Sequence, residues 1–174
     1  MKIFDVRNER VEDLVDAAAR IVFAGGTLVY PDETGYVLGG DPFQPAACTV
    51  VWEHARGTPA ATICVASTTE LLELASGNAL AVAAIKRLPQ RAAIVLRRPR
   101  WLASAAVRGS TLAFRVPDDP FARALLDRCG PLVTCATSYD GADLNGLPQT
   151  DALMERGEVA PQAEVSIVDL GPQG

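Results

Sequence analysis

The order of apolar and polar residues predicts an amphipathic helix near the start of the chain and a strand directly after it. The helix is indicated by apolar residues three and four positions apart, namely Val11, Leu14, Val15, Ala18 and Val22. Asn8 is a plausible N-terminal cap, and Gly25 and Gly26 end the helical pattern. Residues 27–30 then fit a buried strand, and we expect Pro31 to end it because proline cannot donate a hydrogen bond within a sheet.

Strand-like and helical segments alternate along most of the remaining chain. Strands are predicted at 60–66, 92–97, 111–116, 131–137 and 163–170. Helices are predicted at 68–75, 78–88 and 118–130, and 49–55 fits a helix better than a strand. This alternation predicts a layered α/β domain. Because no clear helix separates 92–97 from 111–116, we expect a twisted, mostly mixed sheet flanked by helices rather than an all-parallel one.

Two of the predicted helices carry specific start and stop signals. Ser67, with Glu70 three residues later, forms a capping-box pattern before the helix at 68–75. Asp119 is the expected cap of the helix within 118–130, with Pro120 at its first helical position and Gly130 at its end.

Composition narrows the class of protein. The chain has 174 residues, 49% of them apolar and 21% charged, which suits one compact domain over residues 1–174. The formal net charge of −5 gives the whole chain no nucleic-acid signature, so any RNA contact needs a local basic patch. No apolar leader follows Met1, and no apolar run approaches the roughly 20 residues of a membrane helix, so we expect no membrane association and a cytoplasmic location.

The residues that commonly hold metals or phosphates form no recognisable motif. The cysteines, Cys48, Cys64, Cys129 and Cys135, form no C-x-x-C pair, and His54 is the one histidine. A zinc site is therefore poorly supported, and we expect reduced, buried thiols. The chain also lacks a P-loop and a G-x-G-x-x-G motif, so neither a metal ligand nor a catalytic residue is assigned.

Polar residues follow predicted strands in three places, which is where ligands usually bind in open α/β sheets. The clusters are the turn 32–36, the pair Thr111 and Arg115 on one face of a strand, and the loop 136–143. Each also has an ordinary structural interpretation. Asp32 and Thr34 are typical residues for bonding turn amides, Arg115 fits a structural ion pair, and 136–143 fits a plain loop.

A basic segment runs from Lys86 to Arg108. Its cations are Lys86, Arg87, Arg91, Arg97, Arg98, Arg100 and Arg108, with Trp101 among them. Interleaved arginine and tryptophan suit a phosphate backbone with stacked bases, although the same composition fits a solvated basic surface.

In chain order, these clusters resemble the YrdC-like family, which includes threonylcarbamoyl-AMP synthases and YciO-type proteins. The family's GG-x-x-x-YPT-[DE]-[ST]-x-Y-G-L-G-C-DP stretch is matched by GGTLVYPDETGYVLGGDP at 25–42, whose GYVLG is closer to the YciO-type GYALG. RVPDDPFARALL at 115–126 is similar to RVP-x-x-P-x-A-x-x-LL, and VTCATSYDGAD at 133–143 to L-x-S-T-S-A-N-x-S-G. SIVDL at 166–170 is similar to T-V-V-D-L, so the resemblance covers nearly the whole chain.

The resemblance implies the family's fold, a twisted α/β sheet of the double-stranded-RNA-binding type with one concave, often basic face. It implies condensation of ATP, bicarbonate and L-threonine to threonylcarbamoyl-adenylate and pyrophosphate, for threonylcarbamoyladenosine modification of tRNA. The implied partners are ATP or a related nucleotide with Mg²⁺, L-threonine and bicarbonate. The family also implies contact with tRNA or double-stranded RNA, for which Lys86–Arg108 is the candidate segment.

The resemblance also implies roles for individual positions. Nucleotide-binding roles fall on Arg56, Thr111, Thr137 and Ser138, where Arg56 is the arginine of a K-x-R motif. Substrate-binding roles fall on Asp32, Thr34, Arg115 and Asp140.

Several positions depart from the family pattern. The threonine of YPT, which touches the amino-acid substrate, is Asp32 here, and the asparagine of the S-T-S-A-N loop is Asp140. Other family residues, a lysine, an asparagine, a histidine and a serine, fall on His54, Ala60, Val65 and Ala136. Repulsion between like charges costs about 1–4 kcal/mol at surface-like dielectric, so anionic substrates should bind less well unless a metal or an amine offsets the charge. Mg²⁺ or a cationic group held by Asp32, Glu33 and Asp140 is one such arrangement.

Two functions stay open at this point. One is an acyl-adenylate-forming synthase, a nucleotidyltransferase with an altered substrate. The other is a family member without synthase activity that still binds a nucleotide or double-stranded RNA. The departures favour the second for L-threonine, whereas the retained Arg56, Thr111, Arg115 and Ser138 favour a nucleotide pocket.

Overall fold

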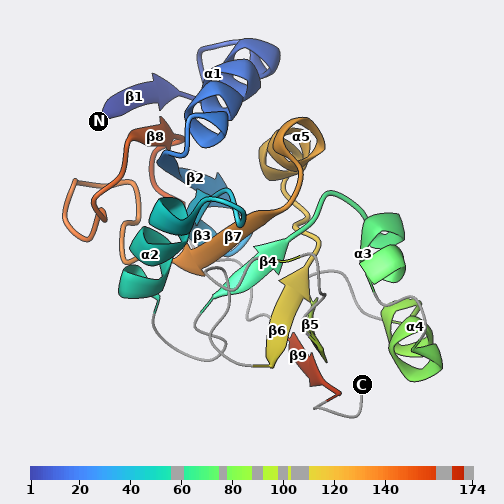
Figure 1. Cartoon of the computed structure of the whole chain (residues 1–174). Helices are drawn as coiled ribbons and strands as arrows, with labels where there is room; N and C mark the ends of the chain where they lie inside the picture. Colours follow the sequence, from blue (N-terminus) through green and yellow to red (C-terminus); the bar gives the residue numbers. More distant parts are fainter. Residues whose placement is uncertain are drawn as a thin grey trace.

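A large mixed sheet forms the centre of the molecule (Figure 1). The computed structural model describes residues 1–55, 61–74, 78–87, 92–97, 102, 110–159 and 166–170. Its strands are β1 (Lys2–Asp5), β2 (Thr27–Asp32), β3 (Gly35–Gly40), β4 (Thr62–Cys64), β5 (Ala92–Arg97), β6 (Thr111–Arg115), β7 (Leu132–Ala136), β8 (Ala152–Glu155) and β9 (Ser166–Asp169). Its helices are α1 (Val11–Phe23), α2 (Pro45–His54), α3 (Thr68–Leu74), α4 (Ala79–Ile85) and α5 (Pro120–Cys129). No helix of this described part is long and apolar enough to cross a membrane.

The strand order confirms the predicted mixed sheet. The order is β1-β8-β2-β3-β7-β4-β6-β5-β9, with parallel pairs at β1–β8, β2–β8, β4–β6 and β5–β9. The other neighbours, including β5 and β6, are antiparallel. An antiparallel pair needs no crossover helix, which explains why no long helical pattern separates these two strands in the sequence.

Helices cover both faces of the sheet. Apolar residues of α1 and α5 pack with one set of alternate strand residues, including Leu28 and Leu132. Residues of α2, α3 and α4 pack with the opposite set, including Val29 and Phe114. Side chains alternate between the two faces along a strand. Arg115, the residue after Phe114, therefore points to the opposite face, which α1 and α5 cover.

The first helix and the strand after it differ in detail from the prediction. Helix α1 begins at Val11 with Arg10 at the N-cap, and Asn8 does not cap it but donates from Nδ2 to Asp5 Oδ2 at 2.7 Å. Strand β2 continues through Pro31 to Asp32. It pairs with β8 only at Leu28 and Val29, so its second half has a neighbour on one side only, where proline is tolerated.

Two strands at one side of the sheet were not predicted. Strand β1 has only four residues, and Lys2 and Ile3 are exposed. Strand β8 is equally short, yet Ala152, Leu153 and Met154 are fully buried between β1 and β2. A four-residue segment is too brief to show a clear period in the sequence.

The capping signals predicted for α3 and α5 are confirmed. Ser67 Oγ accepts a hydrogen bond from Glu70 N at 3.2 Å, and Glu70 Oε2 accepts one from Ala66 N at 3.0 Å. Asp119 Oδ1 accepts hydrogen bonds from Phe121 N at 2.9 Å and Ala122 N at 3.0 Å, and Gly130 follows the last residue of α5.

The N-cap of α5 gives a stability prediction. Asp119→Ala removes the carboxylate oxygen that accepts hydrogen bonds from two backbone amides, and we expect it to lower the free energy of unfolding by about 1–2 kcal/mol. Asp127→Ala, an exposed aspartate of the same helix, is the matched control and should change it by less than about 0.5 kcal/mol. Urea denaturation of both variants measures the difference. Equal losses in the two variants would contradict a capping role.

Candidate functional site

The turn that attracted attention in the sequence is the tip of a tight β-hairpin. Asp32 of β2 pairs with Gly35 of β3, so Glu33 and Thr34 form a two-residue turn between the strands. Gly35 has a φ of 127°, a backbone conformation that favours glycine. Asp32 Oδ1 accepts hydrogen bonds from the backbone N of Thr34 at 2.7 Å and from its Oγ1 at 2.6 Å. The structural interpretation of Asp32 and Thr34 as turn-bonding residues is thus confirmed.

Arg115 reaches this hairpin tip from the end of β6. Its Nη1 donates to Glu33 Oε1 at 2.9 Å, and its Nη2 contacts Asp32 Oδ2. The side chains of Arg115, Asp32 and Glu33 are only 5%, 1% and 5% exposed. The interpretation of Arg115 as part of a structural ion pair is confirmed, and the pair has two carboxylates rather than one.

Glu33 connects this ion pair to the start of α5. While its Oε1 binds Arg115, its Oε2 accepts hydrogen bonds from the backbone N of Asp118 at 3.0 Å and of Asp119 at 3.3 Å. One guanidinium nitrogen and two backbone amides therefore converge on a single carboxylate. These are the groups that proteins use to bind anions.

The surroundings favour the charged guanidinium. Burial acts against the charged form of Arg115, but Cys64, Asp32 and Glu33 outweigh it and raise the pKa of Arg115 above its usual value. Burial raises the pKa of Cys64, although Arg115 and Thr134 act against that rise. At neutral pH Cys64 is therefore a neutral thiol, and the counter-charges of Arg115 are the two carboxylates.

A second polar network lies beside the hairpin, and sequence reasoning missed most of it. Arg156 Nη2 donates to Asp119 Oδ1 at 3.0 Å, and the backbone N of Arg156 donates to the Tyr36 hydroxyl at 2.8 Å. The Tyr139 hydroxyl donates to Glu155 Oε2 at 2.5 Å. The rings of Tyr36 and Tyr139 pack edge to face, with their centroids 4.7 Å apart. Sequence reasoning had placed Tyr36 in the turn 32–36 and Tyr139 in the loop 136–143, but it assigned no role to Glu155 or Arg156.

The loop after β7 contacts the same hairpin through Thr137. Its backbone N and Oγ1 both donate to the carbonyl oxygen of Tyr36, at 3.0 and 2.9 Å. Ser138 is exposed, and the exposed Asp140 accepts a hydrogen bond from Ala142 N at 2.9 Å. Thr137 and Ser138 thus lie near the hairpin, with Ser138 open to solvent.

Other predicted residues lie apart from this cluster or outside the described residues. Thr111 begins β6 and Arg115 ends it, so their Cα atoms are about 13 Å apart along the strand. Arg56 lies outside the described residues, as does most of Lys86–Arg108. Of the cations in that segment, Lys86, Arg87 and Arg97 lie among the described residues, and all three are exposed. The roles predicted for Arg56 and for the basic segment remain predictions.

The carboxylates proposed for Mg²⁺ do not converge on one point and already have hydrogen-bond or ion-pair partners. Asp32 and Glu33 contact Arg115, whereas Asp140 accepts a hydrogen bond within its own loop. Within the described part of the chain, no three histidine, cysteine or acidic residues gather in a way that would hold a metal ion. The described residues therefore do not form a protein-only metal cage.

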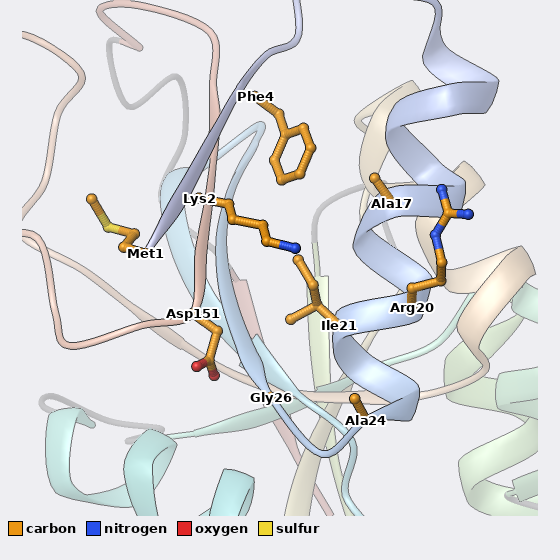
Figure 2. Close-up of a pocket in the computed structure, with 9 residues that line it drawn as sticks. All are labelled: Met1, Lys2, Phe4, Ala17, Arg20, Ile21, Ala24, Gly26 and Asp151. Atoms are coloured by element: carbon orange, nitrogen blue, oxygen red, sulfur yellow. The ribbon is translucent and has the colours of Figure 1, made fainter.

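A groove of about 680 Å³ lies elsewhere, between β1 and α1 (Figure 2). Figure 2 shows Lys2 extending into the space between the strand and the helix, while Arg20 points away from β1. Asp151 Oδ2 accepts a hydrogen bond from Thr27 N at 2.8 Å, so this lining carboxylate helps to hold the start of β2. None of the residues that line the groove belongs to the predicted site.

Comparison with known proteins gives a family match and similar curated proteins. The family model Sua5_yciO_yrdC, described as Telomere recombination, matches residues 20–170. An uncharacterized protein of Haemophilus influenzae is 30% identical over an alignment of 132 residues, and the match covers 71% of this chain and 62% of that protein. The chain therefore spans less than two thirds of the length of this relative.

Solved structures share the fold. E. coli YciO matches with a TM-score of 0.77 and 21% identity, over 97% of this chain and 89% of that one. P. abyssi Sua5 complexed with L-threonine matches with a TM-score of 0.76 and 22% identity, over 98% of this chain and 54% of that one. At these identities the likeness establishes the fold and nothing further.

The tyrosines give a pH prediction. Burial is the largest cause that raises the pKa of all three tyrosines of the chain, Tyr30, Tyr36 and Tyr139. The pKa of Tyr36 rises to about 12, and the hydrogen bond to Glu155 adds to the rise for Tyr139. An unfolded tyrosine ionises near pH 10, so above that pH the unfolded state binds fewer protons than the folded state. The free energy of unfolding should therefore fall as pH rises from about 10 to about 12.

Phenolate absorbance measured against pH tests this expectation. The folded protein should show almost none at pH 10, whereas protein in concentrated urea should be about half ionised there. Tyr36→Phe should remove part of the loss of stability above pH 10. Ionisation of the folded protein at the same pH as the unfolded chain would contradict the burial of these hydroxyls.

Proposed function

Since the chain belongs to the Sua5/YciO/YrdC family, we propose that it binds a nucleotide beside the hairpin tip and uses ATP to activate a small substrate. The observation that carries this proposal is the convergence of separate motifs of the resemblance at one place. The tip of the β2–β3 hairpin contacts Arg115 at the end of β6, and the loop after β7 contacts the same hairpin through Thr137. Strand-end loops of this kind are the usual ligand sites of open α/β sheets.

The reaction proposed is adenylate formation of the threonylcarbamoyl-AMP synthase type. ATP, bicarbonate and an amine-bearing substrate give a carbamoyl-adenylate and pyrophosphate, a product suited to tRNA threonylcarbamoyladenosine modification when the amine is that of L-threonine. The P. abyssi Sua5 structure, which is complexed with L-threonine, supports an amino acid as the amine source in this fold. We place this activity in the cytoplasm.

Four residues of the chain are proposed to hold the nucleotide. We assign the nucleotide to Arg56, Thr111, Thr137 and Ser138. The exposed Ser138 hydroxyl is available for a phosphate or ribose oxygen, and Arg56 supplies positive charge for the triphosphate. Mg²⁺ enters with ATP, where it offsets phosphate charge, because it is commonly held by substrate phosphates and one or two carboxylates.

A second function is favoured by one specific observation. Asp32 stands where the synthases have a threonine, and its carboxylate pairs with Arg115 inside the hairpin. This favours a family member that binds a nucleotide, or tRNA or double-stranded RNA through Lys86–Arg108, without turning over L-threonine.

Pyrophosphate release separates the two functions. The protein is incubated with ATP, bicarbonate and L-threonine, in parallel with the double variant Arg56→Ala/Ser138→Ala. If synthase activity is present, the double variant should lose about tenfold or more, because each lost contact to an anion is worth about 1.5–3 kcal/mol. Arg20→Ala/Ser166→Ala, which changes an exposed arginine and an exposed serine of other elements, is the matched control.

The absence of release above the double variant would exclude the synthase function for L-threonine. Calorimetric titration with ATP, AMP and a short RNA duplex then tests binding. Heat with ATP or AMP that is lost in Arg56→Ala/Ser138→Ala supports the nucleotide site. No heat with any of the three would overturn both functions.

A further inference from the structure

The segment between β7 and β8 contains an asparagine that is followed by glycine. The asparagines of the chain are Asn8, Asn78 and Asn145, and only Asn145 precedes a glycine. The backbone nitrogen that follows an asparagine can attack its side-chain amide, and glycine favours this attack because it has no Cβ in the way. Such chemistry makes asparagine one of the heat-sensitive residues of proteins. The sequence therefore favours this reaction at Asn145 over the other two positions.

The surroundings of Asn145 leave both reacting groups accessible. Asn145 and Gly146 are exposed, and within the described part of the chain the backbone N–H of Gly146 donates no hydrogen bond. The turn around them is closed by a long hydrogen bond from Leu147 N to Leu144 O, at 3.3 Å. The Asn145 side chain is held on the surface, where its Nδ2 donates to Asp143 Oδ2 at 2.9 Å. Exposed bonds of this kind have a modest net strength, so the turn can open locally without global unfolding.

Gly146 joins this turn to the loop that follows β7. It has a φ of 76°, and a Cβ added to it would lie 2.7 Å from the carbonyl carbon and oxygen of Ser138 and 3.0 Å from Tyr139 N. The glycine therefore packs directly on the peptide bond between Ser138 and Tyr139. The Tyr139 hydroxyl in turn donates to Glu155 of β8. A change in the main chain just before Gly146 is thus transmitted to a buried tyrosine.

We propose that Asn145 is a self-modifying site, which converts to aspartate and isoaspartate in the folded protein and thereby releases the Ser138–Tyr139 segment. Both products place a carboxylate beside Asp143, where Nδ2 of Asn145 now donates a hydrogen bond, so a favourable contact becomes a repulsion. Isoaspartate also lengthens the main chain by one carbon atom before Gly146, which displaces the glycine from its close contact. This inference goes beyond the proposed function and needs no bound nucleotide.

The reaction needs only water. The backbone nitrogen of Gly146 gives up its proton and bonds to Asn145 Cγ, while the bond from Cγ to Nδ2 breaks and ammonia leaves with a proton from solvent. The ring that remains is a succinimide. Water then adds to a carbonyl carbon of the ring, and the bond from that carbon to the ring nitrogen breaks. Opening at Cγ gives aspartate, and opening at the main-chain carbon gives isoaspartate.

Peptide mapping of the intact protein tests the conversion. Trypsin cleaves after Arg128 and Arg156, and the peptide between them contains Asn145 as its one asparagine. The protein is incubated for several weeks at 37 °C, folded or in concentrated guanidinium chloride, and the converted peptide is detected by mass spectrometry. Conversion in the folded protein should be no more than about a hundredfold slower than in the unfolded chain, because only local opening is needed. It should be faster at pH 9 than at pH 7, since the attacking nitrogen must lose its proton.

Asn145→Gln is the matched control, because glutamine keeps the amide but would have to close a larger ring. Its peptide should stay unconverted under the same conditions. Gly146→Ala is unsuitable, since its Cβ would clash with the Ser138 backbone. Conversion of the folded wild type that is more than about a hundredfold slower than in the unfolded chain would overturn the proposal, and this comparison needs no variant. Equal conversion of the Asn145→Gln peptide would also overturn it.

A second measurement tests the release of the Ser138–Tyr139 segment. Ion-exchange chromatography separates the converted protein, which carries the added negative charge. The converted protein should melt at a lower temperature, and Tyr139, whose pKa is raised mainly by burial, should form its phenolate at lower pH than in fresh protein. The difference in phenolate absorbance should vanish in Tyr139→Phe. Asn145→Asp adds the charge without lengthening the chain and should change both readings less than isoaspartate does. A converted protein with the melting temperature and phenolate titration of fresh protein would overturn the release.

Discussion

The buried contact between Arg115 and the Asp32–Glu33 pair joins parts of the sheet that are not neighbours. In the strand order, β3, β7 and β4 lie between β2 and β6, yet the guanidinium at the end of β6 reaches the tip of the β2–β3 hairpin. Glu33 extends the link to the amides that begin α5, and Asp119 extends it to Arg156. The hairpin tip, the start of α5 and the segment after β8 are thus held by one chain of charged contacts.

Removing one partner of this buried ion pair would cost much free energy, so the position of the hairpin tip is strongly fixed. A buried ion pair adds little net stability compared with apolar packing, but removing one partner leaves an uncompensated charge and typically costs about 3–5 kcal/mol. Arg115 has two buried carboxylates that depend on it, so few substitutions at this position are tolerable.

Local signals in the sequence predicted much of the fold, and the remainder depended on long-range pairing. The helix caps could be predicted because each capping side chain bonds a backbone amide no more than three residues away. This holds for Ser67 with Glu70 and for Asp119, which Pro120 follows. The prediction that Pro31 ends the strand was wrong, because proline is excluded only where its nitrogen faces a neighbouring strand. Local sequence does not reveal that β8 pairs with β2 only at Leu28 and Val29. Within the site, sequence reasoning placed Asp32 and Arg115 in one pocket but treated the carboxylate as a repulsive addition. The two residues are 83 positions apart, and only the fold shows that they face each other.

The pairing of β1 with β8 has a consequence for synthesis on the ribosome. Lys2 pairs with Ala152, so the first strand of the chain waits for a partner about 150 residues behind it. At roughly 5–20 residues per second, that delay is about 8–30 s. During this time Ile3, which stays 56% exposed even in the folded protein, has no strand beside it. Strand β1 therefore stays without its parallel partner until β8 has been synthesised, and its short length and the charges of Lys2 and Asp5 disfavour pairing with other chains.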